Sequence, residues 1–291
     1  MIETWKKTEL DKLLRAYGFQ YSKGRGQNFL VDRNVLEKVA AAADLSPDDH
    51  VIEIGPGAGA LTVFLAQAAG RVTAVEIDGR LIPLLEEVTE GLANVTIVHK
   101  DFLKYRPDIA SEEKRSSPKA NAAYKLVGNL PYYITTPIIA GLFEPGAEGV
   151  RPEPPVLAVF MVQKEVAERL LSPPGRKAYG AISVLVQYYA EAELLFTVSH
   201  EVFTPRPKVD SAVIRLTPRD LSGDDPDTAA RMFRLVRAGF DMRRKTLKNS
   251  LASAGFPAEK LAAAHGQAGI DPGRRAETLS PRDFYTLASY L

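Results

Sequence analysis

A strand, a glycine turn and a helix follow one another near residue 55, and this succession constrains the fold more than any other feature. The apolar run Val51–Ile54 leads into Gly-Pro-Gly-Ala-Gly at positions 55–59, and Ala60–Ala69 continues with helical spacing. Arg71–Ile77 supplies a second strand, which predicts a βαβ unit in a parallel sheet. Its carboxylate Glu76 follows the first glycine by about twenty residues, a spacing typical of adenosine-type cofactor sites. A tight turn that only packs is the alternative.

A third strand also ends in side chains that suit an adenine ring. Val95–His99 is followed by Asp101 and Phe102. The Asp101 carboxylate can accept a hydrogen bond from an adenine amino group, and the Phe102 ring can border the base. For this pair alone, a surface turn is the alternative.

A fourth strand leads into an amide, a proline and an aromatic ring. The strand Tyr124–Val127 is expected to stop at Gly128, where the chain turns through Asn129-Leu130-Pro131-Tyr132. The amide oxygen and a backbone carbonyl can accept hydrogen bonds from an exocyclic amine, while the tyrosine offers a stacking face. Because ligands bind at the carboxyl ends of strands in open α/β sheets, this position suits a planar amine. An ordinary strand-to-loop turn is the alternative.

Composition narrows the class of protein. The 291 residues include 45% hydrophobic and 25% charged side chains, as in ordinary globular proteins, and the length suggests two domains. The chain has no cysteine and four scattered histidines, so we expect no disulfide, no thiol nucleophile and no metal site. No apolar run is long enough for a membrane span and no signal peptide is evident, so a cytoplasmic location is expected.

The remaining pattern predicts an α/β domain over residues 1–218 and a helical domain over residues 219–291, with an acidic, glycine-containing break after Pro218. The last two strands are expected to close the sheet as an antiparallel pair. Further strands are predicted at Val156–Val162, Ala192–Val198 and Ser211–Leu216, and helices at Trp5–Tyr17, Asn34–Ala43, Thr135–Phe143, Gln163–Leu171, Tyr179–Tyr189, Ala229–Phe240, Thr246–Ala254 and Pro281–Leu291.

Cations cluster locally although the net charge is only +1. Two loops, around Lys23 and Arg25 and around Lys208, carry cations beside glycines or prolines. We predict contacts with RNA phosphates from these residues and from the basic segment that contains Arg243, Arg244, Lys245 and Lys248. For each cation alone, an exposed surface position is the alternative.

The ordered set of motifs resembles one family, the bacterial small-subunit ribosomal RNA dimethyladenosine transferases. The resemblance runs from about Tyr21 to the C-terminus. It rests on Gln27-Asn28-Phe29-Leu30, Glu53-Ile54-Gly55-Pro56-Gly57-Ala58-Gly59, Glu76-Ile77-Asp78, Asp101-Phe102, Asn129-Leu130-Pro131-Tyr132, Phe203–Val213, Arg243-Arg244-Lys245-Thr246-Leu247 and Arg275-Ala276-Glu277-Thr278-Leu279. It implies an α/β, Rossmann-like S-adenosylmethionine-dependent methyltransferase domain as the catalytic domain, residues 1–218. A small all-helical, RNA-binding domain would follow, residues 219–291.

The resemblance also implies a reaction and its site. S-adenosylmethionine would methylate two adjacent adenosines near the 3′ end of 16S rRNA in the small ribosomal subunit. In the acceptor half, Asn129 and Leu130 would hold the adenine amine, Pro131 would fix the turn, and Tyr132 and Phe203 would cover the two faces of the base. The implied cofactor residues are Asn28, Leu30, Glu53, Gly55, Gly57, Gly59, Glu76, Ile77, Asp101, Phe102 and Asn129.

Other functions stay open at this point. A related methyltransferase could act on large-subunit rRNA, as antibiotic-resistance enzymes do, and DNA adenine methylation is more distant. The protein could instead serve mainly as a ribosome-assembly factor, and the glycine turn alone would also suit a nicotinamide enzyme. A monomer is expected.

Overall fold

The computed structural model describes residues 2–21, 27–105, 123–143 and 153–291. The expected loop cations Lys23 and Arg25, and most of the two polar connections at 104–122 and 144–155, lie outside these ranges. The chain divides into two compact units: residues 1–167 with 193–218, and residues 168–192 with 219–291. These units share the expected division after Pro218 but differ from the ranges 1–218 and 219–291, because residues 168–192 group with the C-terminal helices.

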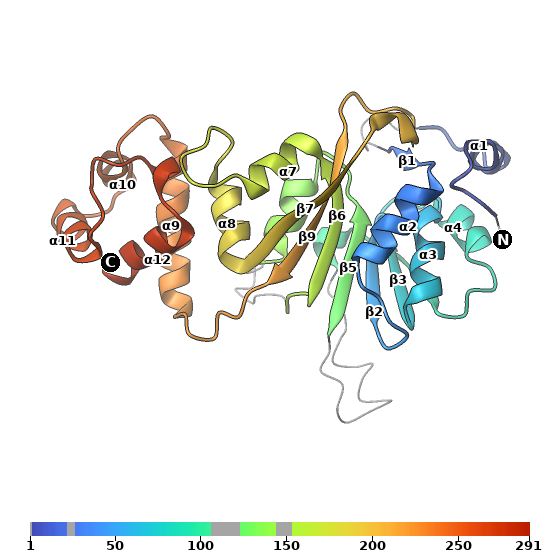
Figure 1. Cartoon of the computed structure of the whole chain (residues 1–291), viewed down its shortest axis with the longest axis horizontal. Helices are drawn as coiled ribbons and strands as arrows, with labels where there is room; N and C mark the ends of the chain where they lie inside the picture. Colours follow the sequence, from blue (N-terminus) through green and yellow to red (C-terminus); the bar gives the residue numbers. More distant parts are fainter. Residues whose placement is uncertain (1, 22–26, 106–122, 144–152) are drawn as a thin grey trace. The chain divides into compact units, whose positions relative to one another are not determined.

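A seven-stranded sheet organises the fold, with strand order β4-β3-β2-β5-β6-β9-β7 (Figure 1). The first five of these strands are mutually parallel, whereas β9 runs antiparallel to β6. The last two strands of the chain, β7 and β9, are neighbours in the sheet, and their expected antiparallel pairing stays a prediction. The strands are β2 His50–Ile54, β3 Arg71–Glu76, β4 Val95–His99, β5 Tyr124–Asn129, β6 Leu157–Gln163, β7 Ala190–Val198 and β9 Ser211–Pro218. A second, two-stranded sheet pairs β1 (Phe29–Leu30) with β8 (Phe203–Thr204) in antiparallel register.

Some of the helices begin at a residue whose side chain caps them. Asp32 caps α2 by accepting a hydrogen bond from the Val35 N–H, and Ser280 forms a capping box with Asp283 at α12. The helices before α9 are α1 Lys7–Ala16, α2 Arg33–Ala42, α3 Ala60–Ala68, α4 Ile82–Val88, α6 Thr135–Gly141, α7 Lys164–Leu171 and α8 Ala181–Tyr189. Four helices follow in the C-terminal region: α9 Pro226–Asp241, α10 Leu247–Ser253, α11 Ala258–Ala268 and α12 Pro281–Ser289.

Apolar side chains from α1, α2 and α3 pack with the sheet. Leu10, Leu36 and Leu65 are fully buried in one core with Val51 and Val127. In the other unit, α9 packs on α12, with Leu235 and Leu287 fully buried. Within the described ranges, no helix has the length and apolar character needed to span a bilayer.

Two features of the expected topology need correction. Helices α4 and α11 were not expected; α4 starts at Ile82-Pro83, where proline opens a helix instead of breaking it. Strand β5 does not stop at Gly128 but continues through Asn129, with Gly128 opposite both Ile54 and Phe160. A Cβ atom at position 128 would lie 2.7 Å from the Ile54 carbonyl oxygen, so glycine permits the close approach of β5 to β2.

We therefore expect Gly128→Ala to lower the free energy of unfolding by about 1–3 kcal/mol, because the added methyl group meets backbone on the neighbouring strand. Gly141→Ala in α6 is the matched control, since nothing among the described residues lies within 4 Å of its ideal Cβ. It should leave stability unchanged or raise it by up to about 1 kcal/mol. Urea unfolding followed by circular dichroism measures both. Equal effects would contradict the close-packing explanation.

Candidate active site

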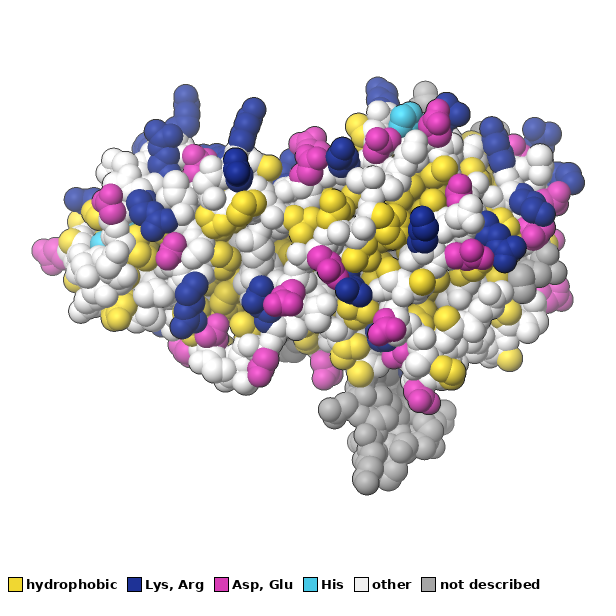
Figure 2. All heavy atoms as spheres, in the orientation of Figure 1, with side chains coloured by type: hydrophobic (Ala, Val, Ile, Leu, Met, Phe, Trp, Pro, Cys, Tyr) yellow, Lys and Arg dark blue, Asp and Glu magenta, His cyan; other side chains and the backbone are white. Residues whose placement is uncertain are grey.

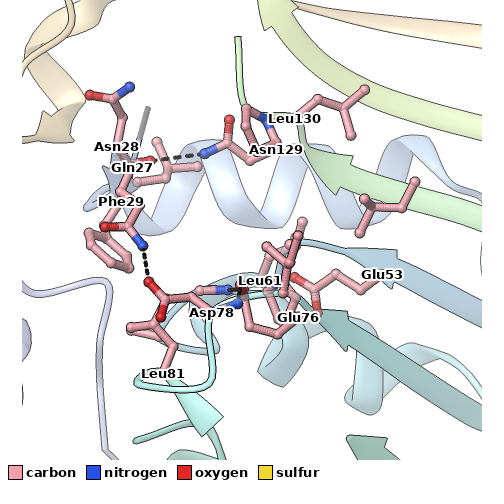
Figure 3. Close-up of a pocket in the computed structure, with 18 of the residues that line it drawn as sticks. Gln27, Asn28, Phe29, Glu53, Leu61, Glu76, Asp78, Leu81, Asn129 and Leu130 are labelled. Atoms are coloured by element: carbon pink, nitrogen blue, oxygen red, sulfur yellow. Dashed lines mark hydrogen bonds between the residues drawn. The ribbon is translucent and has the colours of Figure 1, made fainter. Parts of the chain in front are cut away.

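A pocket lies where the parallel strands end, and most of the expected site residues line it (Figure 3). Of the expected cofactor residues, all but Gly59 line the pocket, as do Leu130, Pro131 and Tyr132 from the expected acceptor set. Most of the lining comes from five segments: Gln27–Leu30, Glu53–Ala58, Glu76–Asp78, Lys100–Phe102 and Asn129–Ile134. The last four follow β2, β3, β4 and β5, because parallel strands place their carboxyl ends at one edge of a sheet.

The glycine turn needs its glycines for two different reasons. Gly55, Gly57 and Gly59 all have positive φ, at +67°, +60° and +79°. A Cβ on Gly57 would lie 3.1 Å from the Phe29 ring, which itself borders the pocket. Gly59 caps α3 and faces Leu85 on α4 instead of the pocket. The absence of a side chain at Gly57 therefore leaves room for the Phe29 ring beside the turn. The absence of one at Gly59 lets α3 pack closely on α4.

Glu76 is buried, with both carboxylate oxygens directed by backbone N–H groups. Its Oε2 accepts a hydrogen bond from the Gly57 N–H at 3.0 Å, and its Oε1 accepts one from the Asp78 N–H at 2.8 Å (Figure 3). Burial raises the pKa of the Glu76 carboxyl, and these two hydrogen bonds oppose the rise. The side chain thus joins the glycine turn to the loop after β3 and presents oriented acceptors to the pocket.

Glu53 is a second buried acid in the lining, 1% exposed. Its Oε2 accepts a hydrogen bond from the Thr62 hydroxyl at 2.5 Å. Burial, with the nearby charge of Glu76, raises the pKa of Glu53 to about 8 despite this hydrogen bond. At neutral pH the carboxyl is therefore mostly uncharged.

Asp101 and Ile77 border the pocket from the ends of β4 and β3. Asp101 Oδ1 accepts a hydrogen bond from the Leu103 N–H at 3.0 Å, which orients the carboxylate at the start of a short 3₁₀ turn, Phe102–Lys104. Ile77 is 45% exposed, an unusual state for a large apolar side chain beside a pocket. A carboxylate acceptor and an apolar surface of this kind suit a purine.

Asn129 has its side-chain amide oriented by a hydrogen bond across the pocket. Its Nδ2 donates to the Asn28 carbonyl at 3.1 Å, which turns the amide so that Oδ1 is the remaining acceptor (Figure 3). Within the described ranges, no donor is bound to that Oδ1 or to the Leu130 carbonyl. Leu130 itself is held by its N–H, which donates to Met161 at 3.0 Å. Two acceptors at the end of β5 are therefore available to a ligand.

Pro131 and Tyr132 are held by partners on either side. The Pro131 carbonyl accepts hydrogen bonds from Ile134 and Thr135, both at 3.1 Å, so it is already engaged. The Tyr132 hydroxyl lies 3.0 Å from the Ser211 Oγ on β9, and burial raises the pKa of the phenol. The ring is thus anchored at its polar end while it lines the pocket.

Phe203 differs from the expected picture. It is 3% exposed, packs in the hydrophobic core beside β1, and is not among the residues that line the pocket. Its β8 register places it opposite Leu30. In this structure Phe203 supports the segment that carries Asn28 and Leu30, and its stacking on a base stays a prediction.

The expected RNA-binding side chains are not all equivalent. Lys208, Arg244, Lys245 and Lys248 are exposed, and Figure 2 shows Lys and Arg side chains projecting over the C-terminal unit. Arg243 is engaged instead: its Nε donates to Glu277 at 2.6 Å and its Nη2 to the Lys177 carbonyl at 2.6 Å. Arg243 therefore links parts of the C-terminal unit, and RNA binding by Arg243 and by the other four residues stays a prediction.

Several residues in the pocket lining or directly behind it had no role assigned from the sequence. Gln27 and Asp78 hydrogen-bond to each other at 2.8 Å, and Thr62 and Ser211 orient Glu53 and Tyr132. A second carboxylate two residues after Glu76 was the available signal for Asp78. The partnerships themselves join residues 9 to 79 positions apart and carry no local pattern.

Comparisons with known proteins identify the family. The family model described as Ribosomal RNA adenine dimethylase matches residues 18–291. A protein of Moorella thermoacetica named "Ribosomal RNA small subunit methyltransferase A" is 45% identical over 280 residues, covering 96% of this chain and 95% of that protein. A protein of the same name from Geobacillus kaustophilus is 45% identical over 288 residues, covering 96% and 94%.

Solved structures show the same fold. A dimethyladenosine transferase from Plasmodium falciparum is similar with a TM-score of 0.72 and 27% identity, covering 89% of this chain and 95% of that chain. The 23S rRNA methyltransferase ErmE is similar with a TM-score of 0.66 and 31% identity, covering 90% and 99%. Because the family model spans nearly the whole chain and the curated relatives match along their full length, this chain belongs to the ribosomal RNA adenine dimethylase family.

Proposed function

We propose that the protein uses S-adenosylmethionine to dimethylate the exocyclic amines of two adjacent adenosines near the 3′ end of 16S rRNA, in the small ribosomal subunit. The observation that carries the proposal is the pair of acceptors at the end of β5, Asn129 Oδ1 and the Leu130 carbonyl, beside a pocket lined with adenosine-binding groups. The names of the relatives support the choice of RNA. A cytoplasmic location follows from a ribosomal substrate in a bacterial cell.

The pocket fits the proposed cofactor. Glu76 presents oriented carboxylate oxygens of the kind that bind ribose hydroxyls, and Asp101 with Ile77 suits the adenine amino group and ring. Gly55 and Gly57 let backbone approach the ligand closely, and Asn28 and Leu30 face them across the pocket. When bound, this cofactor supplies an electrophilic methyl group on a positively charged sulfur.

The acceptor end would act by holding an amine in place. An adenine amine is a poor nucleophile because its lone pair is delocalised into the ring. Hydrogen bonds from its two N–H groups to Asn129 Oδ1 and the Leu130 carbonyl favour a pyramidal nitrogen and stabilise the positive charge that develops there. Once the methyl group has passed from sulfur to this nitrogen, the nitrogen loses a proton to water. Alignment, supported by stacking on Tyr132, is therefore the main contribution of the site.

The choice of ribosomal subunit rests on sequence similarity. The curated relatives at 45% identity carry the small-subunit name, whereas the 23S rRNA methyltransferase ErmE is 31% identical.

A target base must leave its stack to reach a pocket at strand ends, as in other enzymes that modify bases. Exposed Arg244, Lys245 and Lys248 would bind phosphates and position the RNA without choosing the base.

Asn129→Ala should lower kcat/KM for rRNA methylation about 10²–10³-fold, because the variant lacks one of the two acceptors for the amine. The control is Asn34→Ala, an exposed amide on α2 that should leave the rate unchanged. The assay incubates enzyme and labelled cofactor with separated, unmethylated ribosomal subunits. If label appeared only in large-subunit RNA, the proposal that 16S rRNA is the substrate would be refuted. Loss of subunit binding in Asn129→Ala, measured by sedimentation, would weaken a separate role in assembly.

Glu53→Gln should change how stability depends on pH. The folded pKa of Glu53 is raised to about 8 from an ordinary value near 4.5, so the wild type loses stability as pH rises through this interval. The glutamine variant cannot ionise and can still accept from Thr62. Relative to the wild type it should gain up to a few kcal/mol between pH 5 and pH 9, at about 1.4 kcal/mol per pH unit. Denaturant unfolding at each pH tests this, with exposed Glu90→Gln as control. If the free energy of unfolding varied with pH in the same way in all three proteins, Glu53 would not be neutral in the folded state.

Combined replacement of Arg244, Lys245 and Lys248 by Gln should weaken RNA binding and make it less dependent on salt. For each phosphate that the variant no longer neutralises, the slope of log affinity against log salt should fall by roughly 0.7–0.9. Lys7, Lys12 and Lys38 replaced together by Gln are the control, since they remove the same charge from exposed sites on α1 and α2. Equal weakening in both variants would assign the effect to net charge. Filter binding over a salt series measures it.

A further inference from the structure

Asp78 is a buried acid that the proposed reaction does not use, and it binds the pocket segment Gln27–Leu30. It is 2% exposed. Its Oδ2 accepts hydrogen bonds from the Gln27 Nε2 at 2.8 Å and the Arg80 Nη2 at 2.6 Å, and its Oδ1 accepts from the Arg80 Nε at 2.9 Å. The Asp78 N–H in turn orients Glu76. Asp78 therefore connects a segment of the pocket wall, through its carboxylate, with the acid assigned to the ribose, through its backbone N–H.

Arg80 continues this connection to the residues on the other side of positions 22–26. Its Nη1 donates to the Gln20 carbonyl at 3.2 Å, and its guanidinium lies 4.8 Å from the centre of the Phe19 ring. Arg80 thus binds the chain before residues 22–26, at Phe19 and Gln20, and Asp78 binds it after them, at Gln27. Arg80 does so without lining the pocket.

An aromatic cluster joins the same two stretches of chain. The rings of Phe19, Tyr21 and Phe29 lie 6.0–6.1 Å apart in edge-to-face arrangements. The Phe29 ring also lies close to Gly57 of the glycine turn, since an ideal Cβ atom on Gly57 would be 3.1 Å from a carbon of that ring. The cluster therefore keeps the segment after position 26 beside the turn that approaches the cofactor.

We propose that Asp78 and Arg80 are positioning residues that hold Gln27–Leu30 as the wall of the cofactor pocket, so that they set the affinity for the cofactor and not the rate of methyl transfer. The proposal rests on the proposed function for the identity of the cofactor. The wall carries Asn28, whose carbonyl orients Asn129. The β1–β8 pairing and the hydrogen bond from the Val31 N–H to the Val202 carbonyl also hold this segment, so it would loosen at the Gln27 end without unfolding.

The pairing chemistry explains why a substitution at Arg80 is informative. The guanidinium binds the carboxylate through two nitrogens in fork geometry, which lysine cannot reproduce although it keeps the charge. Without the guanidinium, the buried carboxylate would keep the hydrogen bonds from Gln27 and from the backbone N–H of residue 80, but it would lose the charged partner that compensates for its burial. Arg80→Gln should therefore loosen the wall, and Arg80→Lys should have an intermediate effect.

The experiment measures binding of S-adenosylmethionine and its demethylated product, S-adenosylhomocysteine, by calorimetry, together with steady-state kinetics. Arg80→Gln should weaken both ligands about tenfold, the factor expected when a hydrogen bond to a charged group is removed. KM for the cofactor should rise about tenfold while kcat at saturation stays within about twofold. Gln27→Leu should add nothing further when combined with Arg80→Gln, since both act through one carboxylate. Arg33→Gln, which breaks an exposed ion pair with Glu37, should change nothing.

The proposal would be overturned if Arg80→Gln bound the cofactor with wild-type affinity, or if its kcat fell by as much as its affinity. Additive effects of Gln27→Leu and Arg80→Gln would also overturn it. Amide hydrogen exchange of residues 27–31 without cofactor separates it from the proposed function. Faster exchange there in Arg80→Gln than in Arg33→Gln supports the positioning role, and unchanged exchange overturns it. Failure of the wild type to bind S-adenosylmethionine, with faster exchange in the variant, would refute the cofactor and keep the positioning role.

Discussion

The paired hydrogen bonds to Glu76 connect the parts of the pocket. The carboxylate lies at the end of β3 and accepts one N–H from the glycine turn after β2 and one from the loop after β3. Both loops depend on the parallel register that brings Ile54 beside Val75 and Gly128. A buried carboxylate is costly unless hydrogen-bonded, so the two N–H groups and the acid stabilise one another's positions. The same arrangement leaves acceptor capacity toward the pocket.

The acceptor groups proposed for the target base are oxygens to which no described protein group donates a hydrogen bond. The Pro131 carbonyl is engaged with the first turn of α6, whereas Asn129 Oδ1 and the Leu130 carbonyl have no bound donor in the described part of the chain. Asn129 owes its orientation to the Asn28 carbonyl, on a segment a hundred residues earlier. The cofactor wall and the amine-binding end therefore meet in one hydrogen bond. A site of this kind needs alignment more than a strong base, which agrees with a lining that has no histidine among the described residues.

Much of the sheet was readable from the sequence because buried parallel strands are short apolar runs bounded by turn residues. The runs ending at Ile54, Glu76 and His99 form strands close to their expected bounds. The end of β5 was misjudged, since Gly128 reads as a turn residue yet serves close strand packing. Helix α11 was missed because its alanine-rich sequence has weak periodicity. Phe203 sits in an aromatic- and proline-containing loop, and its motif does not reveal that the ring is buried.

The sequence by itself determined which residue types stand at the strand ends: the glycine turn, Glu76, Asp101 and the Asn129–Tyr132 turn. Those assignments rest on local periodicity and on spacing along the chain, which are properties of short segments. Only the tertiary structure decided which oxygens are available, which cations are engaged, and that Asp78 connects Gln27 to Arg80. These outcomes depend on hydrogen bonds and burial between residues far apart in sequence, which strand register and packing establish. Arg243 and Arg244 are identical neighbours in the sequence, yet one binds Glu277 and the other is exposed.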